Sequence, residues 1–116
     1  MKKFLLLIHG PIGSGKTTIA NQLHTKLPRT ALLGLDRIKW FVSSFKRNKA
    51  NNLMTQNVVI AMVHEYLRQG INVIVEQAFK PAQVLLFKKL AKKNKVNFFI
   101  YQLSAPRQIL LGRIRE

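Results

Sequence analysis

The chain has 116 residues, of which 47% are hydrophobic, and its 20 Lys and Arg side chains against four acids give a formal net charge of +16. This length and apolar content predict one globular domain over residues 1–116 and exclude a disordered chain. Cysteine is absent, which excludes disulfides, Cys-based zinc sites and thiol nucleophiles. The sequence has no apolar run long enough to cross a bilayer, so we expect a cytoplasmic protein without a membrane partner.

The positive charge has two interpretations. A lysine-rich solvated surface is the simpler one, and binding of a polyanion such as RNA or DNA is the alternative. Basic residues gather at residues 46–49 and again at residues 88–95, but aromatic residues do not alternate with them as they do in many RNA-binding segments. We therefore favour the solvated surface and keep nucleic acid as the alternative partner.

The first predicted element is a short apolar strand over residues 3–8, and a phosphate-binding loop follows it. From Gly10 to Thr17 the sequence matches the pattern G-x-x-x-x-G-K-[ST] at every defined position. Beyond the loop, Ile19, Leu23 and Leu27 recur at helical spacing. A strand, this loop and a helix, in that order, form the context in which the motif binds the phosphates of a nucleoside triphosphate.

Each residue type in the loop has a chemical reason. Glycines let the backbone approach a phosphate closely, so that successive N–H groups and the start of the helix bind the anion. We expect Lys16 to reach the β- and γ-phosphates of ATP and the Thr17 hydroxyl to ligate Mg²⁺. The residues expected to bind the nucleotide are Gly10, Pro11, Ile12, Gly13, Ser14, Gly15, Lys16, Thr17 and Thr18.

The middle of the chain predicts a second strand and two helices with a loop between them. Residues 30–35 form an apolar strand that ends at Asp36, and residues 38–45 predict a short helix with partly exposed aromatic side chains. Residues 46–52 are polar and predict a mobile loop. A long helix then begins with Asn51 or Asn52 as its cap and ends at Gly70. Its predicted apolar stripe comprises Val58, Val59, Met62, Val63, Tyr66 and Leu67.

The last third of the chain continues the alternation of strands and helices. Residues 71–75 form a β-branched strand that ends at Glu76, and Pro81 opens a helix with lysines on its outer face. Residues 96–103 predict a fourth strand, and Pro106 opens a final helix. Because strands alternate with helices, we predict an α/β fold with three α/β/α layers around a parallel sheet of about four strands.

Two of the four acids, Asp36 and Glu76, follow predicted strands and so lie at the sheet edge that carries the phosphate loop. Phosphoryl transfer needs a Mg²⁺ anchor, an activated nucleophile and charge stabilisation. We expect Asp36 to be the general base for a substrate hydroxyl, and Glu76 to hold the Mg²⁺ water shell or to orient the substrate. Arg37 and Lys39 are candidates for steadying an anionic substrate, with ordinary solvated charge as an equal alternative.

These segments resemble the small kinases of the P-loop nucleoside triphosphatase superfamily. The resemblance rests on the phosphate loop and on residues 33–37 (LGLDR), 71–76 (INVIVE) and 103–115. Within that group the chain is most similar to the AAA-type single-domain kinases, which include chloramphenicol phosphotransferase, zeta toxins and polynucleotide kinase. The resemblance implies Mg-ATP as the phosphate donor, Asp36 as the substrate-activating acid, and Arg113 as the first arginine of a lid that contacts ATP.

Relatives of this type continue past that arginine into a lid, a further strand and an adenine-contacting loop, whereas this sequence stops at Glu116. We therefore expect a fragment or a truncated relative, with the C-terminal lid and last strand missing. Three functions stay open: a kinase for a small molecule or nucleotide, a polynucleotide or RNA kinase that uses the basic surface, and an ATP-binding module without catalysis. Trp40, Phe41 and Phe45 either line the acceptor pocket or, as we favour, belong to apolar core or surface.

Overall fold

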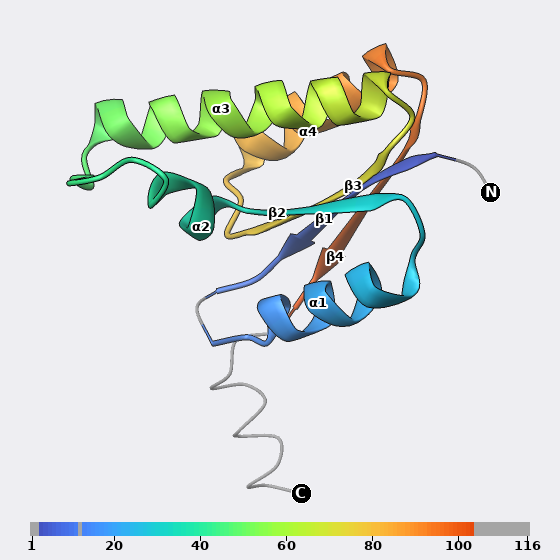
Figure 1. Cartoon of the computed structure of the whole chain (residues 1–116), viewed down its shortest axis with the longest axis horizontal. Coiled ribbons are helices and arrows are strands. Elements are labelled where there is room, and N and C mark those ends of the chain that lie inside the picture. Colours follow the sequence, from blue (N-terminus) through green and yellow to red (C-terminus); the bar gives the residue numbers. More distant parts are fainter. Residues whose placement is uncertain (1–2, 12, 104–116) are drawn as a thin grey trace, which may run out of the picture.

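The computed structural model describes residues 3–11 and 13–103 of the chain (Figure 1). The predicted helix that Pro106 opens, and Arg113 within it, lie outside the described residues. In chain order the elements are β1 (Phe4–His9), α1 (Lys16–Lys26), β2 (Thr30–Gly34), α2 (Leu35–Lys39), α3 (Lys49–Arg68), β3 (Asn72–Gln77), α4 (Pro81–Lys93) and β4 (Asn97–Gln102).

The four strands form one parallel sheet in the order β2-β3-β1-β4. β1 lies between β3 and β4, and β2 pairs with β3 so that Gly34 lies opposite Glu76. The predicted α/β fold with a parallel sheet of about four strands is therefore confirmed. Because all strands run in one direction, the segments that follow β1, β2 and β3 meet at the same edge of the sheet.

Helices cover both faces of this sheet. α3 and α4 lie on one face and α1 lies on the other (Figure 1). Strand side chains alternate between the faces, so Leu7 and Val75 join the apolar cluster with α3 and α4, while Ile8 and Ile74 join the cluster with α1. All four side chains are fully buried, and burying each contributes roughly 1.5–3 kcal/mol. These two apolar clusters hold the edge that carries the site.

The long helix α3 begins earlier than predicted. Its cap is Asn48, whose side-chain oxygen accepts a hydrogen bond of 2.8 Å from the backbone N–H of Asn51, so the expectation that Asn51 or Asn52 caps the helix was wrong. The fully inward positions are Thr55, Val59, Val63 and Leu67. Two residues of the predicted stripe, Val58 and Tyr66, are exposed instead, because α3 packs on the sheet through one narrow face.

The short helix α2 begins three residues before the segment predicted to be helical, residues 38–45, and covers only the first two residues of it. It ends at Lys39, and turns follow up to Ser44, which has a positive φ of 56°. The polar loop is correspondingly shorter than residues 46–52, because α3 begins at Lys49. Trp40 and Phe41 are 55% and 73% exposed, so they do not belong to the core.

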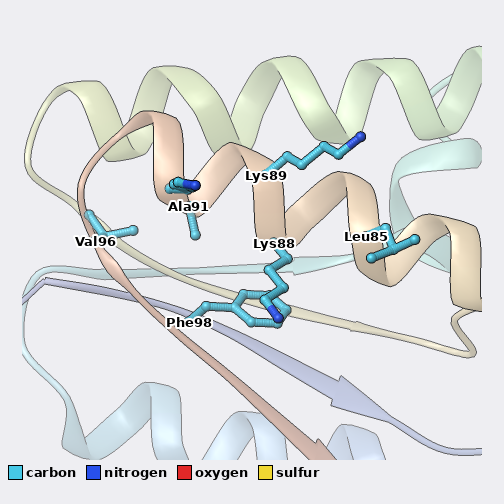
Figure 2. A pocket seen from close by; sticks show the side chains of 7 residues that line it. Leu85, Lys88, Lys89, Ala91, Val96 and Phe98 are labelled. Atoms are coloured by element: carbon cyan, nitrogen blue, oxygen red, sulfur yellow. The ribbon is translucent and has the colours of Figure 1, made fainter.

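The two basic segments lie on different parts of the fold, one on α4 beside β4 and the other between α2 and α3. Lysines of α4 line a hollow of about 440 Å³ between α4 and β4, together with apolar residues (Figure 2). Arg47, in the other segment, lies against Trp40 after α2. The hollow between α4 and β4 is lined by Leu85, Lys88, Lys89, Ala91, Lys92, Val96 and Phe98.

Within the described ranges, none of the helices has the length and apolar character needed to cross a membrane.

The helices α3 and α4 end in the same way but with different residues. At the end of α3 the N–H groups of Gly70 and Ile71 bond to the carbonyls of Leu67 and Tyr66, and Gly70 has a φ of 81°. At the end of α4 the equivalent residue with positive φ is Lys95, at 58°. An L-residue in this left-handed region costs about 1–2 kcal/mol, which glycine does not pay.

We expect Lys95→Gly to stabilise the fold by about 0.5–1 kcal/mol, because relief of the left-handed strain exceeds the extra entropy of glycine in the unfolded chain. Gly70→Ala is the matched control and should destabilise by about 1 kcal/mol. A Cβ at Gly70 meets nothing closer than Lys3 Cε at 4.0 Å, so this loss reports backbone strain alone. Urea unfolding midpoints measure both changes. If both variants shifted the midpoint equally and in the same direction, the explanation by left-handed backbone strain would be contradicted.

Candidate active site at the phosphate loop

The loop between β1 and α1 leads into a helix start whose backbone N–H groups have no partner in the described ranges, while the Ser14 N–H bonds to the carbonyl of Pro11 at 3.1 Å. Gly13 and Gly15 have positive φ values of 78° and 93°, and Gly15 is the N-cap of α1. No side chain caps this helix start, and its first turn has no acidic residue. The N–H groups of the first turn therefore remain available for an anion, and the helix dipole favours negative charge there.

Two further features of the loop fit a bound phosphate. A Cβ on Gly10 would overlap Ser14 Oγ and lie 3.2 Å from the Cβ atoms of Ser14 and Leu103, so a side chain there would require Ser14 to move. Ser14 Oγ is buried and has no hydrogen-bond partner within the described part of the chain. A buried hydroxyl beside the free N–H groups at the start of α1 is suited to an anionic oxygen, which would satisfy it.

Lys16 lies inside the loop. The residue is only 9% exposed, and its Nζ lies 3.4 Å from the carbonyl oxygen of Pro11. This contact is at the long limit of a hydrogen bond, so it holds the ammonium group weakly. The group is thus positioned to exchange the carbonyl for the stronger, charged oxygen of a phosphate.

Thr17 and Glu76 are joined directly. The Thr17 hydroxyl donates a hydrogen bond of 2.8 Å to Glu76 Oε1, although the residues are 59 positions apart. The pairing of β1 with β3 causes this contact, because Ile8 lies opposite Glu76 in the register. A hydroxyl and a carboxylate are hard oxygen ligands of the kind that Mg²⁺ prefers. No cluster of three or more His, Cys, Asp or Glu residues occurs in residues 3–11 and 13–103, so phosphate and water oxygens would complete the shell.

A hollow of about 240 Å³ joins the loop to the ends of β2 and β3. Its lining comprises Gly13, Lys16, Thr17, Gly34, Asp36, Arg37 and Glu76. The structure thus brings the two acids together with Gly13, Lys16 and Thr17 of the loop. Thr18 lies in the first turn of α1 and is exposed. Two predicted site residues, Ile12 and Arg113, lie outside the described residues.

Both acids lie slightly differently from the sequence prediction. Glu76 is still within β3 rather than after it, and Asp36 is in the first turn of α2 because β2 ends at Gly34. Asp36 is the more open of the two, with a side chain that is 74% exposed. It projects from the start of a helix at the mouth of the hollow, where a ligand could reach it from solvent.

Lys39 makes a contact that sequence reasoning missed. Its Nζ lies 2.6 Å from Asp36 Oδ1, and the Lys39 residue itself is buried. The hydrogen bond from Lys39 has the largest effect and lowers the pKa of Asp36; burial opposes it, and the charges of Lys39, Lys16 and Arg47 lower the pKa further. Asp36 is therefore ionised well below neutral pH. The spacing of three residues on a helix was the available signal for this pair.

An aromatic and basic cluster next to Asp36 was also missed. Trp40 packs edge-on against Phe45 with ring centroids 5.8 Å apart. Lys39 Nζ and Arg47 Cζ each lie 5.6 Å from the centre of a Trp40 ring. Cation–π contacts of this kind need no alternation of aromatic and basic residues in the sequence. The absence of such alternation therefore gave no sign of this cluster.

The parallel sheet and the loop between β1 and α1 define a P-loop nucleoside triphosphatase fold of the kinase-like type. The chain belongs to the AAA domain family, whose sequence profile matches residues 5–116. Among functionally curated proteins, none matches the sequence at a significant level.

Solved structures share this fold at low sequence identity. A provisionally assigned kinase from Chloroflexus aurantiacus superposes with a TM-score of 0.78 and 21% identity, over 98% of this chain and 65% of that one. A chain of the Pnkp1/Rnl/Hen1 complex gives 0.77 and 20%, over 97% and 39%. The APS kinase CysC of Mycobacterium tuberculosis, bound to AMPPNP and APS, gives 0.64 and 16%, over 87% and 62%. This chain therefore spans less than two thirds of each of these neighbours.

The ion pair at the mouth of the hollow generates a pH prediction. Replacing Lys39 in Lys39→Met should raise the pKa of Asp36 toward its ordinary value, because the donor and the nearest positive charge are lost. The folded-state pKa of Asp36 is lowered, so the pair stabilises the fold above pH about 4 and loses this contribution as pH falls through the folded pKa. Carboxyl carbon titration of Asp36 by NMR measures the change.

The matched control for this titration is Arg68→Met, which breaks the surface pair with Glu65. It should raise the pKa of Glu65 and leave the titration of Asp36 unchanged. An Asp36 titration that is identical in the native chain and in Lys39→Met would contradict the assignment of Lys39 as the dominant partner.

Proposed function

We propose that the protein is a kinase that binds Mg-ATP and transfers the γ-phosphoryl group to a hydroxyl of a small molecule or nucleotide. The observation that carries the proposal is the convergence of Lys16, Thr17, Glu76 and Asp36 on one hollow. The kinase-like fold of the structural neighbours supports the reaction class. Phosphoryl transfer asks little covalent chemistry of a protein and depends mainly on positioning and charge, which this set of residues can supply.

Each residue has a defined task in this proposal. The free N–H groups at the start of α1 and Lys16 would hold the β- and γ-phosphates. Thr17 and Glu76 would hold Mg²⁺ directly or through its water shell, and a bound Mg²⁺ would supply charge neutralisation at the phosphates. The donor and acceptor then meet at the carboxyl edge of the sheet. Arg37 lines the same hollow and offers a further positive charge to an anionic group.

Asp36 acts on the acceptor. Its carboxylate accepts the proton of the acceptor hydroxyl as that oxygen bonds to the γ-phosphorus and the bond from this phosphorus to the β–γ bridging oxygen breaks, which releases ADP. Lys39 holds Oδ1, so the other carboxylate oxygen faces the hydroxyl. A lowered pKa suits orientation of the hydroxyl and late proton transfer, because the transition state of phosphoryl transfer is loose. Arg113 stays a candidate for contact with ATP, as the family resemblance implies.

Two variants separate nucleotide binding from transfer. Mg-ATP at a hundred times its dissociation constant should stabilise the native chain by roughly 2.7 kcal/mol, and Lys16→Ala should lose this gain. Asp36→Asn should keep the gain but lose about 10²–10⁴ in transfer rate, because it cannot take a proton. Thermal midpoints and transfer of labelled γ-phosphate to a ribonucleoside, a hexose and a 5′-hydroxyl oligoribonucleotide give the two readouts.

The matched acid control is Glu65→Gln, which changes a carboxylate on the outer face of α3 and should alter neither readout. Near-normal transfer by Asp36→Asn would remove Asp36 as the base. A nucleotide shift in the native chain without transfer to any probe would instead favour the ATP-binding module.

A polynucleotide acceptor is the second candidate. The cluster of Trp40, Lys39 and Arg47 favours it, because an exposed aromatic ring beside cations binds the bases and phosphates of single strands. The cluster lies next to Asp36, and the net charge of +16 would attract a polyanion. Two of the structural neighbours are chains of Pnkp1/Rnl/Hen1 assemblies, one of which is described as an RNA repair complex.

This candidate predicts that affinity for a 5′-hydroxyl oligoribonucleotide falls steeply between low and physiological salt. Trp40→Ala should weaken binding by about 5- to 150-fold, through loss of stacking worth about 1–3 kcal/mol. Phe99→Ala, at an equally exposed aromatic on the opposite edge of the sheet, is the control and should have little effect. Fluorescence anisotropy measures both variants, and an affinity independent of salt would exclude the candidate.

A further inference from the structure

A buried amide without a partner lies beside the proposed active site. Gln77, the last residue of β3, is only 4% exposed, and neither its Nε2 nor its Oε1 has a hydrogen-bond partner in the described ranges. The other amide of the same strand behaves differently, because Asn72 Oδ1 accepts a hydrogen bond of 3.0 Å from the backbone N–H of Phe4. An unsatisfied buried amide is costly and needs an explanation.

Strand alternation places Gln77 on the face of the sheet that α3 and α4 cover. Val73 and Val75 belong to the apolar cluster on that face. Gln77 is two residues further along the strand, so its side chain lies on the same face. Glu76, on the other face, bonds to Thr17. One strand end therefore presents a carboxylate to the phosphate loop and an amide to the α3 side.

The polar groups near this strand end are already occupied by other partners. His9 is the register partner of Gln77 on β1, but its Nδ1 accepts a hydrogen bond of 2.8 Å from the N–H of Phe79. Thr55 is the first buried residue of α3, and its hydroxyl donates a hydrogen bond of 3.0 Å to the carbonyl of Asn51. The helix α2, which carries Asp36, packs Ile38 into the same apolar cluster.

An acceptor must reach this end of the sheet for transfer to occur. Its reacting hydroxyl has to lie between Asp36 and the γ-phosphate, and Gly34 at the base of α2 lies opposite Glu76, one residue before Gln77. The Gln77 amide has no internal hydrogen bond to break, so a rotamer change toward the ligand, or a small movement of α2, costs little hydrogen-bond energy. Gln77 does not line the hollow itself, so such a movement would be needed to bring its amide to what lies next to the reacting hydroxyl.

We propose that Gln77 recognises the phosphate acceptor by hydrogen bonding to a hydroxyl of a sugar ring that neighbours the reacting hydroxyl. This inference rests on the proposed kinase function. A sugar hydroxyl both donates and accepts, which matches the two free groups of the amide. A charged group would be disfavoured, because Gln77 offers no opposite charge at a buried position. The sugar has two sources, a free sugar or the ribose of a nucleoside or nucleotide.

The first test needs no acceptor. Gln77→Leu removes an unsatisfied buried amide and should raise the thermal midpoint of the free protein by about 4 °C or more. Asn72→Leu removes a bonded amide at the other end of the same strand and should lower it. A lowered midpoint in Gln77→Leu would mean that its amide is satisfied in the free protein, for example by a structural water, and would overturn the proposal.

The second test measures transfer from Mg-ATP to a hexose, to adenosine and to 2′-deoxyadenosine. Gln77→Leu should keep the full midpoint shift with Mg-ATP and raise the KM for the accepted sugar at least tenfold. The preferred probe identifies the source of the sugar. If Gln77 binds the ribose 2′-hydroxyl, the preference for adenosine over 2′-deoxyadenosine should disappear in Gln77→Leu.

The outcomes separate this inference from the proposed function. Absence of a Mg-ATP shift in the native chain would overturn the kinase proposal and this inference with it. A normal shift and normal transfer, with the same KM in Gln77→Leu, would overturn the role of Gln77 alone. Transfer to none of the three sugar probes, despite a normal Mg-ATP shift, would overturn the sugar hydroxyl as the recognised group.

Discussion

The parallel pairing of β1 with β3 is the constraint on which the site depends. Leu7 and Val75 on one face and Ile8 and Ile74 on the other are fully buried, and the pairing of these two strands puts the ends of both at one edge. Burial of each side chain contributes roughly 1.5–3 kcal/mol, whereas the exposed hydrogen bond from Thr17 to Glu76 contributes about 1 kcal/mol. The apolar sheet therefore holds the polar site in place, and the polar contact is free to open for a ligand.

Charge at this edge is arranged around one carboxylate. Lys39 contacts Asp36 directly, and Lys16 and Arg47 lower its pKa from further away. In a chain with a formal net charge of +16, such surroundings keep Asp36 ionised and also attract anionic ligands. In the proposed kinase reaction these cations would attract the nucleotide and a polynucleotide acceptor and would weaken Asp36 as a base, which fits late proton transfer.

Unsatisfied polar groups gather where the proposed ligands would bind. Ser14 Oγ in the loop and the amide of Gln77 on the opposite face of the sheet are the buried side-chain groups without partners in the described part of the chain. Other buried polar groups, such as those of Asn72 and Thr55, are hydrogen bonded. Stability lost at such positions is regained when a ligand supplies the missing partner, so they are sensible places to look for recognition.

Local patterns in the sequence determined the loop, the four strands and the parallel α/β fold, because a glycine-rich phosphate motif and short apolar runs between helices require no distant partner to be recognised. They also placed Asp36 and Glu76 at one edge, through the rule that parallel strands end together. Helix boundaries were less secure: the cap at Asn48 and the early end of α2 depend on local hydrogen bonds that competing Asn and aromatic residues mask in the sequence. Only the tertiary structure decided that Lys39 is buried against Asp36, that Arg47 lies over Trp40 and that Gln77 has no partner. These features depend on which groups lie within a few ångströms of each other after packing, and sequence spacing does not fix those distances.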